Sequence, residues 1–398
     1  MKITWKENLV MILAVLAVLV IMTGCEYDAP TAMWYQDRGT SVSPVITQIN
    51  PAQALGGVNY LTIMGENFST DSGSNRVYVD GVKVDIVEYS ETSLKVRRPS
   101  VTGDSTTIKV ATATGVDLGI YTGYSISTVV GPYGGFIASE QFGALALDKS
   151  NETVYAFDKV YKNVYQVTAD GEKTQIGTSE RAIKDALVAP DGGLVLLLGR
   201  KNINKMDPVT GEEIEWINIE KSVTFGDYDA NGNLFVSGKK SDVYVIAPDL
   251  TYRTLGLYVN DNVLALRIFG NDLYVAVELK SPADGEPETG IWKHEILDAN
   301  GNLGPRELVL DWSQTGDYAE STILDISLSA SGILYVDTDN TQPMFMVDRD
   351  GNMDILYKDI IAAGAQRILW GTGNLLYLVL DGDTSDLLFV DMGEGVAQ

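Results

Sequence analysis

The chain has 398 residues, with 54 acidic and 29 basic side chains and a formal net charge of −25 at pH 7. Such an acidic surface repels the phosphates of DNA and RNA, which argues against a nucleic-acid-binding protein. The chain holds one histidine and one cysteine, which excludes zinc sites built from several histidines and excludes an internal disulfide.

The first 24 residues have the features of an export signal. Lys2 and Lys6 precede the apolar run 9–22, which is too short for a comfortable transmembrane helix. The run ends in the letters I-M-T-G-C at 21–25, which resemble the lipobox of bacterial lipoproteins. That resemblance implies a lipid on Cys25. The alternatives are a retained membrane anchor and a cleaved signal with an incidental cysteine. Residues 26–43 mix Pro, Ser, Thr and Gly without a clear period, so 25–43 is expected to be the lipidated cysteine and a tether.

Acidic residues follow the cysteine. Glu26 and Asp28 resemble a signal for display on the outer surface in some Gram-negative groups, although ordinary linker polarity explains them equally well. We therefore expect an extracytoplasmic, lipid-anchored protein at the outer membrane or cell surface. The sequence leaves open which side of the membrane holds it.

Short strands fill residues 44–127. The segment 44–51 alternates and is bracketed by prolines, which suits an edge strand, and Asp80-Gly81 predicts a hairpin. Many short strands in roughly 85 residues indicate a sandwich. The letters P-V-I-T-Q-I-N-P at 44–51, G-G at 56–57 and L-T-I-M-G-E-N-F at 61–68 resemble the IPT/TIG immunoglobulin-like domain. That resemblance implies a spacer or binding module without catalysis.

A repeat organises residues 128–398. A polar Gly/Asn/Asp turn followed by an apolar, β-branched or aromatic run occurs six times, with anchor positions at 154, 194, 234, 273, 334 and 376. Steps of 40, 40, 39, 61 and 42 residues are typical of a β-propeller with one four-stranded blade per period. The expected fold class is therefore all-β, with an immunoglobulin-like sandwich and a six-bladed β-propeller. The strand and turn pattern resembles NHL-like and SMP-30-like propellers.

Two details of the ring can be predicted. The chain ends soon after the third strand of the last copy, so we expect residues 128–131 to supply the outer strand of blade six. The step of 61 residues places extra residues between Glu278 and Asp311 in blade four, either as a binding loop or as a neutral surface extension. His294 lies there and is expected on the strand surface.

One turn has the composition of a calcium loop. Asp348, Asp350, Asn352 and Asp354 alternate around Gly351, and a hard cation needs such oxygen ligands. The EF-hand order is not met, and blade turns use Asp-Gly-Asn for backbone reasons alone. Calcium is therefore the only cofactor considered, with turn formation as the alternative.

Aromatic side chains are the remaining candidates for ligand binding. Trp292, Trp312, Tyr318 and Trp370 could stack on sugar rings or on side chains of a partner protein. Trp312 and Tyr318 lie in the polar stretch 311–321, which is expected to reach a propeller face. The chain has no H-E-x-x-H and no G-x-S-x-G motif, and we predict no catalytic residue.

The sequence favours one function over two others. It predicts a non-enzymatic cell-envelope lipoprotein that binds or scaffolds a protein or polysaccharide through its propeller face. The letters L-D-A-N-G-N-L-G at 297–304 look like a turn of SMP-30-type hydrolases, which implies a metal-dependent lactonase in the tunnel. The metal ligands of that family cannot be carried over, because no Glu precedes Gly131-Pro132. A structural subunit of a surface assembly is the third reading.

Overall fold

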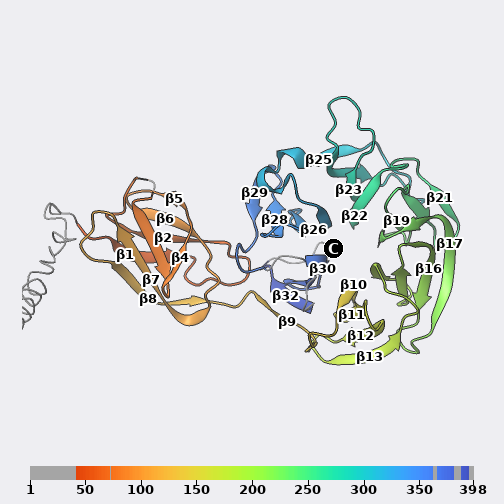
Figure 1. Cartoon of the computed structure of the whole chain (residues 1–398), viewed down its shortest axis with the longest axis horizontal. Coiled ribbons are helices and arrows are strands. Elements are labelled where there is room, and N and C mark those ends of the chain that lie inside the picture. Colours follow the sequence, from red (N-terminus) through yellow and green to blue (C-terminus); the bar gives the residue numbers. More distant parts are fainter. Residues whose placement is uncertain (1–41, 72, 362–364, 381–386, 394–398) are drawn as a thin grey trace, which may run out of the picture.

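The computed structural model describes residues 42–71, 73–361, 365–380 and 387–393. The predicted signal, Cys25 and nearly all of the tether lie outside these residues. Within the described part no helix is long and apolar enough to cross a membrane. The described chain forms eight four-stranded sheets, two in a sandwich and six in a ring (Figure 1). The all-β fold class is confirmed.

The sandwich has two antiparallel sheets. Their strands, in spatial order, are β1 (Val45–Asn50), β2 (Tyr60–Glu66), β6 (Ser93–Arg97) and β5 (Ile86–Tyr89), and β4 (Val82–Val84), β3 (Asn75–Val79), β7 (Gly103–Thr112) and β8 (Gly119–Ile126). Strand β1 is an edge strand, as predicted. Asp80 and Gly81 adopt positive φ and join β3 to β4 as the predicted hairpin. Alternate residues such as Leu61 and Ile63 are fully buried between the sheets.

Six sheets form the blades of the propeller, each running from an inner to an outer strand. Their strands are β10 (Phe142–Asp148), β11 (Thr153–Asp158), β12 (Asn163–Val167) and β13 (Lys173–Thr178); β14 (Asp185–Val188), β15 (Leu194–Leu197), β16 (Arg200–Met206) and β17 (Glu213–Val223); β18 (Phe225–Tyr228), β19 (Leu234–Ser237), β20 (Tyr244–Ile246) and β21 (Tyr252–Thr254); β22 (Asn262–Phe269), β23 (Asp272–Glu278), β24 (Thr289–Glu295) and β25 (Glu307–Asp311); β26 (Ile323–Leu328), β27 (Leu334–Thr338), β28 (Met344–Val347) and β29 (Met353–Ile355); and β30 (Ala365–Trp370), β31 (Leu375–Leu380), β32 (Leu387–Asp391) and β9 (Val130–Pro132). The six inner strands are neighbours around the ring, and β10 contacts β30.

A strand from the start of the propeller closes the ring. Val130 and Gly131 of β9 pair with Val390 and Phe389 of β32, so β9 becomes the outer strand of blade six. The closure predicted from the sequence is therefore confirmed. Because β9 satisfies the outer edge of β32, blade six is complete and is fixed to the end of the sandwich.

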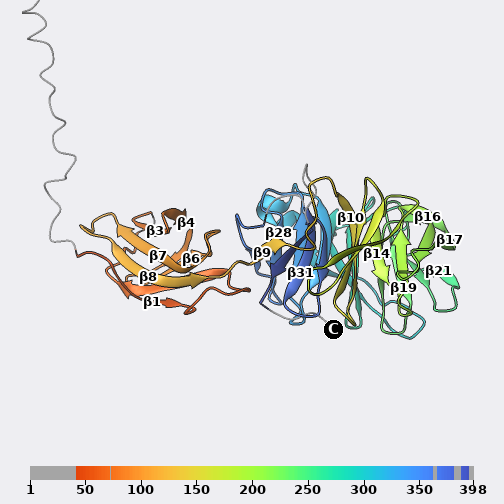
Figure 2. The same ribbon diagram turned by 90° about the horizontal axis from the view of Figure 1, so that it is seen from below.

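The sandwich contacts the propeller through an acidic side chain of blade five. Asp354, on β29, accepts hydrogen bonds from Asn59 Nδ2 at 2.9 Å, Arg97 Nη1 at 3.1 Å and the Tyr60 hydroxyl. Asn59 Oδ1 accepts from the backbone N–H of Tyr357 at 3.2 Å. Both partners of the Asp354–Arg97 ion pair are about four-fifths buried. The sandwich therefore meets the rim of the ring and leaves the central tunnel uncovered (Figures 1 and 2).

The two faces of the propeller carry different connections. The tight turns that set the sequence repeat join each inner strand to the second strand, so they all lie on one face, which we call the turn face. The connections between blades lie on the opposite face, which we call the connector face. The longest of these, 312–322, contains the short helices η1 (Trp312–Gln314) and η2 (Gly316–Tyr318).

The extra residues of blade four do not form one loop. They are divided among the β23–β24 loop at 279–288, the β24–β25 connection at 296–306, and the 312–322 connection. Arg306 Nε donates to Glu286 Oε1 at 3.0 Å, which ties the first two segments together. The β23–β24 loop projects from the rim of the ring, away from the tunnel (Figure 1).

Candidate functional site

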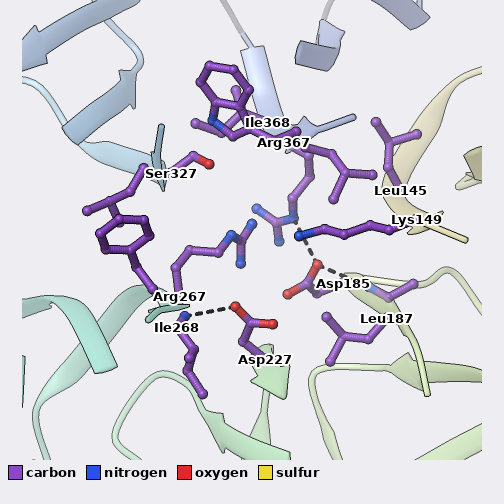
Figure 3. Close-up of a pocket in the computed structure, with 15 residues that line it drawn as sticks. Leu145, Lys149, Asp185, Leu187, Asp227, Arg267, Ile268, Ser327, Arg367 and Ile368 are labelled. Atoms are coloured by element: carbon purple, nitrogen blue, oxygen red, sulfur yellow. Dashed lines mark hydrogen bonds and ion pairs between the residues drawn. The ribbon is translucent and has the colours of Figure 1, made fainter. Parts of the chain in front are cut away.

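The central tunnel contains a narrow chamber of about 130 Å³. All six inner strands contribute to its wall, together with Lys149 in the turn after β10. Figure 3 shows Lys149, Arg267 and Arg367 converging with Asp185 and Asp227 on a common space. The chamber thus gathers charged residues of both signs from blades that are far apart in the sequence.

The carboxylates of the inner strands connect neighbouring blades. Asp227 Oδ2 accepts from the backbone N–H of Ile268 in the next blade at 2.8 Å. Asp325 Oδ2 accepts from the backbone N–H of Ile368 at 3.2 Å, and Asp185 Oδ2 accepts from the backbone N–H of Gly226 at 3.4 Å. Each hydrogen bond satisfies a backbone donor that faces the adjacent inner strand. These three acids therefore have a structural role in holding the ring together.

Two arginines neutralise these carboxylates. Arg267 Nη2 lies 2.7 Å from Asp325 Oδ2, and Arg267 Nη1 donates to the Leu266 carbonyl at 2.8 Å. Arg367 Nη2 donates to the Lys184 carbonyl at 2.6 Å, and its Nε lies 3.8 Å from Asp185 Oδ1. The two arginines of the chamber therefore lie close to its carboxylates, as buried charges must, whereas Lys149 is exposed.

Burial changes the acidity of these groups. It raises the pKa of Asp185 to about 6, although the cationic Arg367 and Arg267 oppose the shift. Burial also raises the pKa of Asp227, again against Arg267. Asp337, on β27 opposite Asp325, is fully buried, and neither of its carboxylate oxygens has a hydrogen-bond partner among the described residues. Burial, with the nearby Asp325 charge, raises the pKa of Asp337 well above its usual range.

A larger cavity of about 590 Å³ opens on the connector face. Its charged lining residues are Lys159, Lys184, Lys239 and Arg367, and no Asp or Glu lines it within the described part of the chain. Apolar side chains, among them Phe225, form the rest of the wall. We call this cavity the basic mouth. Arg367 lines both the basic mouth and the narrow chamber, so the two cavities are adjacent along the tunnel.

All four predicted ligand-binding aromatics are buried core residues. Trp292, Trp312 and Tyr318 are only 1%, 3% and 6% exposed, which corrects the expectation that they form a binding face. Trp312 and Tyr318 pack against Phe345 with their rings tilted, at centroid distances of 5.9 and 4.5 Å. The 312–322 connection turns inward because these rings bury a large apolar area between blades four and five. Trp370 is also buried, but it lines the narrow chamber.

The predicted calcium ligands are not brought together. Asp348 Oδ1 accepts from the backbone N–H groups of Asp350 and Asn352 at 2.9 and 2.8 Å, and its Oδ2 accepts from Asn352 Nδ2 at 2.9 Å. Asp354 lies on β29 and faces the sandwich. Among the described residues no group of three His, Cys, Asp or Glu side chains could hold a metal ion. Turn formation accounts for Asp348 and Asn352.

The same turn occurs in two other blades. Asp229 and Asp298 each accept from the backbone N–H and the side-chain amide of an Asn four residues later, Asn233 and Asn302. The D-x-[DN]-G-N sequence is therefore a recurrent hairpin device in this propeller. It also explains residues 298–302, which resembled a turn of SMP-30-type hydrolases.

His294 is a core residue, contrary to the surface position expected from the sequence. It is 1% exposed, its Nδ1 donates to the Gly304 carbonyl at 2.9 Å, and its Nε2 accepts from the Tyr258 hydroxyl at 2.8 Å. Burial lowers its pKa, which favours the neutral ring. Both ring nitrogens are bonded, so His294 organises the β24–β25 connection.

The sequence interpretation missed every charged residue of the tunnel. Asp185, Asp325 and Arg367 each lie nine residues before an anchor of the repeat, at 194, 334 and 376. Charged residues at one repeat position in several blades are a signal that alignment of the copies reveals. That signal would have indicated a shared layer of the tunnel.

Residues 44–128 match the IPT/TIG domain family. The cyclomaltodextrin glucanotransferase of Niallia circulans is 33% identical over 99 residues, and that of Bacillus sp. (strain 1-1) is 32% identical over 95 residues. Each match covers 24% of this chain and 13% of the relative. The chain thus spans about an eighth of the length of these curated relatives, and the similarity does not extend to the whole protein.

Solved structures resemble more of the chain. An auxiliary nutrient binding protein from Bacteroides ovatus superposes with a TM-score of 0.51 at 12% identity, covering 87% of this chain and 97% of that protein. A luciferin-regenerating enzyme gives a TM-score of 0.55 at 12% identity over 68% of this chain and 97% of its own. A gluconolactonase from Xanthomonas campestris superposes with a TM-score of 0.50 at 13% identity, covering 73% of this chain and 91% of that protein. At these identities the similarity shows the fold alone, which binding proteins and enzymes share.

Proposed function

We propose that this protein is a non-catalytic binding protein of the cell envelope, held by a lipid on Cys25, with its ligand seated at the basic mouth. The arrangement of charges in the tunnel supports this proposal. Asp185, Asp227 and Asp325 each accept a backbone N–H, and two arginines neutralise them. A hydrolase of lactone type needs carboxylates that converge on a metal or on an attacking water. Here the carboxylates are engaged with the protein itself.

The basic mouth is the larger of the two tunnel cavities and is open to solvent. Its volume of about 590 Å³ is in the range of small-molecule sites, and it combines apolar walls with a few polar groups. The similar fold of proteins described as auxiliary nutrient binding proteins is compatible with this role, and saccharides are the first ligands to test.

Lactone hydrolysis is the second candidate. A carboxyl group whose pKa is raised to about 6 can act as a general base near neutral pH, and Asp185 lies in the wall of the narrow chamber. Proteins described as gluconolactonases share this fold, so the fold is compatible with lactone hydrolysis but does not by itself indicate that activity.

One preparation tests both candidates. Binding to a panel of neutral and acidic oligosaccharides is measured by calorimetry, and hydrolysis of a sugar lactone is followed with and without added divalent metal. Saturable binding without turnover supports the proposal. Metal-dependent turnover that Asp185→Asn abolishes would establish the lactonase instead. A stoichiometric protein partner recovered from solubilised envelopes, with no saccharide binding, would replace both with a scaffold role.

A further inference from the structure

We infer that the ligand of the basic mouth is anionic, and specifically a saccharide bearing carboxylate or sulfate groups. This inference rests on the proposed binding function and defines its ligand class. The contrast between the cavity and the rest of the chain supports it. The chain has 54 acidic and 29 basic side chains, yet every charged residue that lines this cavity is basic.

The cations enter the cavity from different blades. Lys159 follows β11 of blade one, Lys184 precedes β14 of blade two, and Lys239 follows β19 of blade three. Blade six adds Arg367. Lys184 and Lys239 are solvent-exposed, so their ammonium groups can reach a bound molecule without a large desolvation cost. A ligand with anionic groups spaced along a chain fits this arrangement better than a single small ion.

Structural salt bridges do not account for two of these residues, Lys184 and Lys239. Other lysines of the described residues pair with an acid, for example Lys173 with Glu140 at 2.9 Å and Lys293 with Glu307 at 3.2 Å. Among the described residues Lys184 and Lys239 form no side-chain ion pair, although the pKa of Glu278 is lowered by its pairing with Lys280 and, in addition, by the Lys239 charge. Their repulsion is tolerated in water at modest cost, and an anion in the cavity would relieve it.

The wall also suits a sugar. Phe225 lies in the same cavity with the aliphatic side chains of Ile183, Leu264 and Leu324. An aromatic ring beside charged groups can contact the apolar face of a pyranose while ammonium groups bind its acidic substituents. Phe225 also has the Arg367 guanidinium 5.0 Å above its ring centroid, which fixes both side chains at the base of the cavity.

The test compares charged and neutral saccharides of matched length. The probes are a tetrasaccharide of galacturonic acid, a sulfated tetrasaccharide, and a neutral galactose tetrasaccharide, each titrated by calorimetry. We expect at least one acidic probe to bind at least ten-fold more tightly than the neutral one. Its affinity should fall further when ionic strength rises from about 0.05 M to about 0.3 M, because salt screens exposed charges. The two acidic probes distinguish carboxylate from sulfate recognition.

Variants locate the site. Lys184→Gln with Lys239→Gln should weaken binding of the acidic probe about ten-fold, as expected for loss of two solvent-exposed charge contacts. The control, Lys83→Gln with Lys109→Gln, changes the net charge equally but lies on the sandwich, and should keep the wild-type affinity. Equal weakening in both variants would show a general charge effect and overturn the assignment. Tight binding of the neutral probe alone would overturn the inference and leave the proposed binding function intact. No binding of any probe would overturn both.

Discussion

The two cavities of the tunnel differ in the sign and the pairing of the charged residues that line them. In the narrow chamber, acids and arginines are buried together and satisfy one another and the backbone. In the basic mouth, which Arg367 also lines, every charged residue of the wall in the described part of the chain is basic, and Lys184 and Lys239 are exposed to solvent. Paired, buried charge indicates a structural role, whereas an open cavity whose charged lining residues all have one sign indicates a ligand. The predictions below test this contrast.

The largest effect is expected in the narrow chamber. Asp325→Ala removes the partner of Arg267 and the acceptor of the Ile368 N–H, and leaves a guanidinium buried without its counter-charge. We expect a loss of about 3–5 kcal/mol in the free energy of unfolding, measured by urea titration. The control Asp317→Ala, on an exposed position of the 312–322 connection, should change stability by less than about 0.5 kcal/mol. A loss below about 1 kcal/mol for Asp325→Ala would contradict the structural role.

The second effect is a dependence on pH. The pKa of Asp185 in the folded protein is raised to about 6, above its usual value of 3.8, so the folded state binds this proton more tightly than the unfolded chain. Its contribution therefore favours folding below pH 4 and is lost as pH rises to 6. Asp185→Asn removes that term. As pH rises from 4 to 7, the free energy of unfolding of the variant should increase relative to that of the wild type by up to about 3 kcal/mol, measured by urea titration at each pH. Parallel stability curves would show that Asp185 does not titrate in this range.

The third prediction concerns the basic mouth. Lys184→Gln with Lys239→Gln should change the unfolding free energy by less than about 0.5 kcal/mol, because exposed ammonium groups contribute little to stability. Thermal denaturation of this variant and the wild type, without ligand, measures the difference. A substantial loss of stability would place these lysines with the structural charges of the chamber and weaken the case for a ligand.

The smallest effect concerns calcium. The Asp348 carboxylate already accepts three hydrogen bonds from its own turn, so millimolar calcium should move the melting temperature by no more than about 1 °C. Removal of calcium with a chelator should likewise leave the melting temperature unchanged. Asp348→Ala serves as a comparison, since it should lower stability by about 1 kcal/mol with or without calcium. A clear rise in melting temperature that Asp348→Ala abolishes would restore the metal site.

Much of the architecture was predictable from the sequence. The spacing of the anchors gave six blades, and the missing last strand gave the closure by β9. Both depend on local patterns, namely polar turns and apolar runs that repeat with a fixed period. The candidate site was not predictable in the same way. The aromatic residues predicted to bind a ligand are too apolar to remain exposed, and Trp312 and Tyr318 pack on Phe345.

The sequence by itself determined the strands, their number and the turns that join them, because these follow from hydrophobic periodicity and from residues such as Gly and Asn. Only the tertiary structure decided which charges face the tunnel. The inner strands of blades four, five and six have a register shift between Val263 and Ala265, Ile323 and Asp325, and Ala365 and Arg367. A bulge adds one residue and reverses the alternation of side chains beyond it. Closing the ring then brings charged side chains of different blades together, such as Asp185 and Arg367, which are 182 residues apart in the sequence.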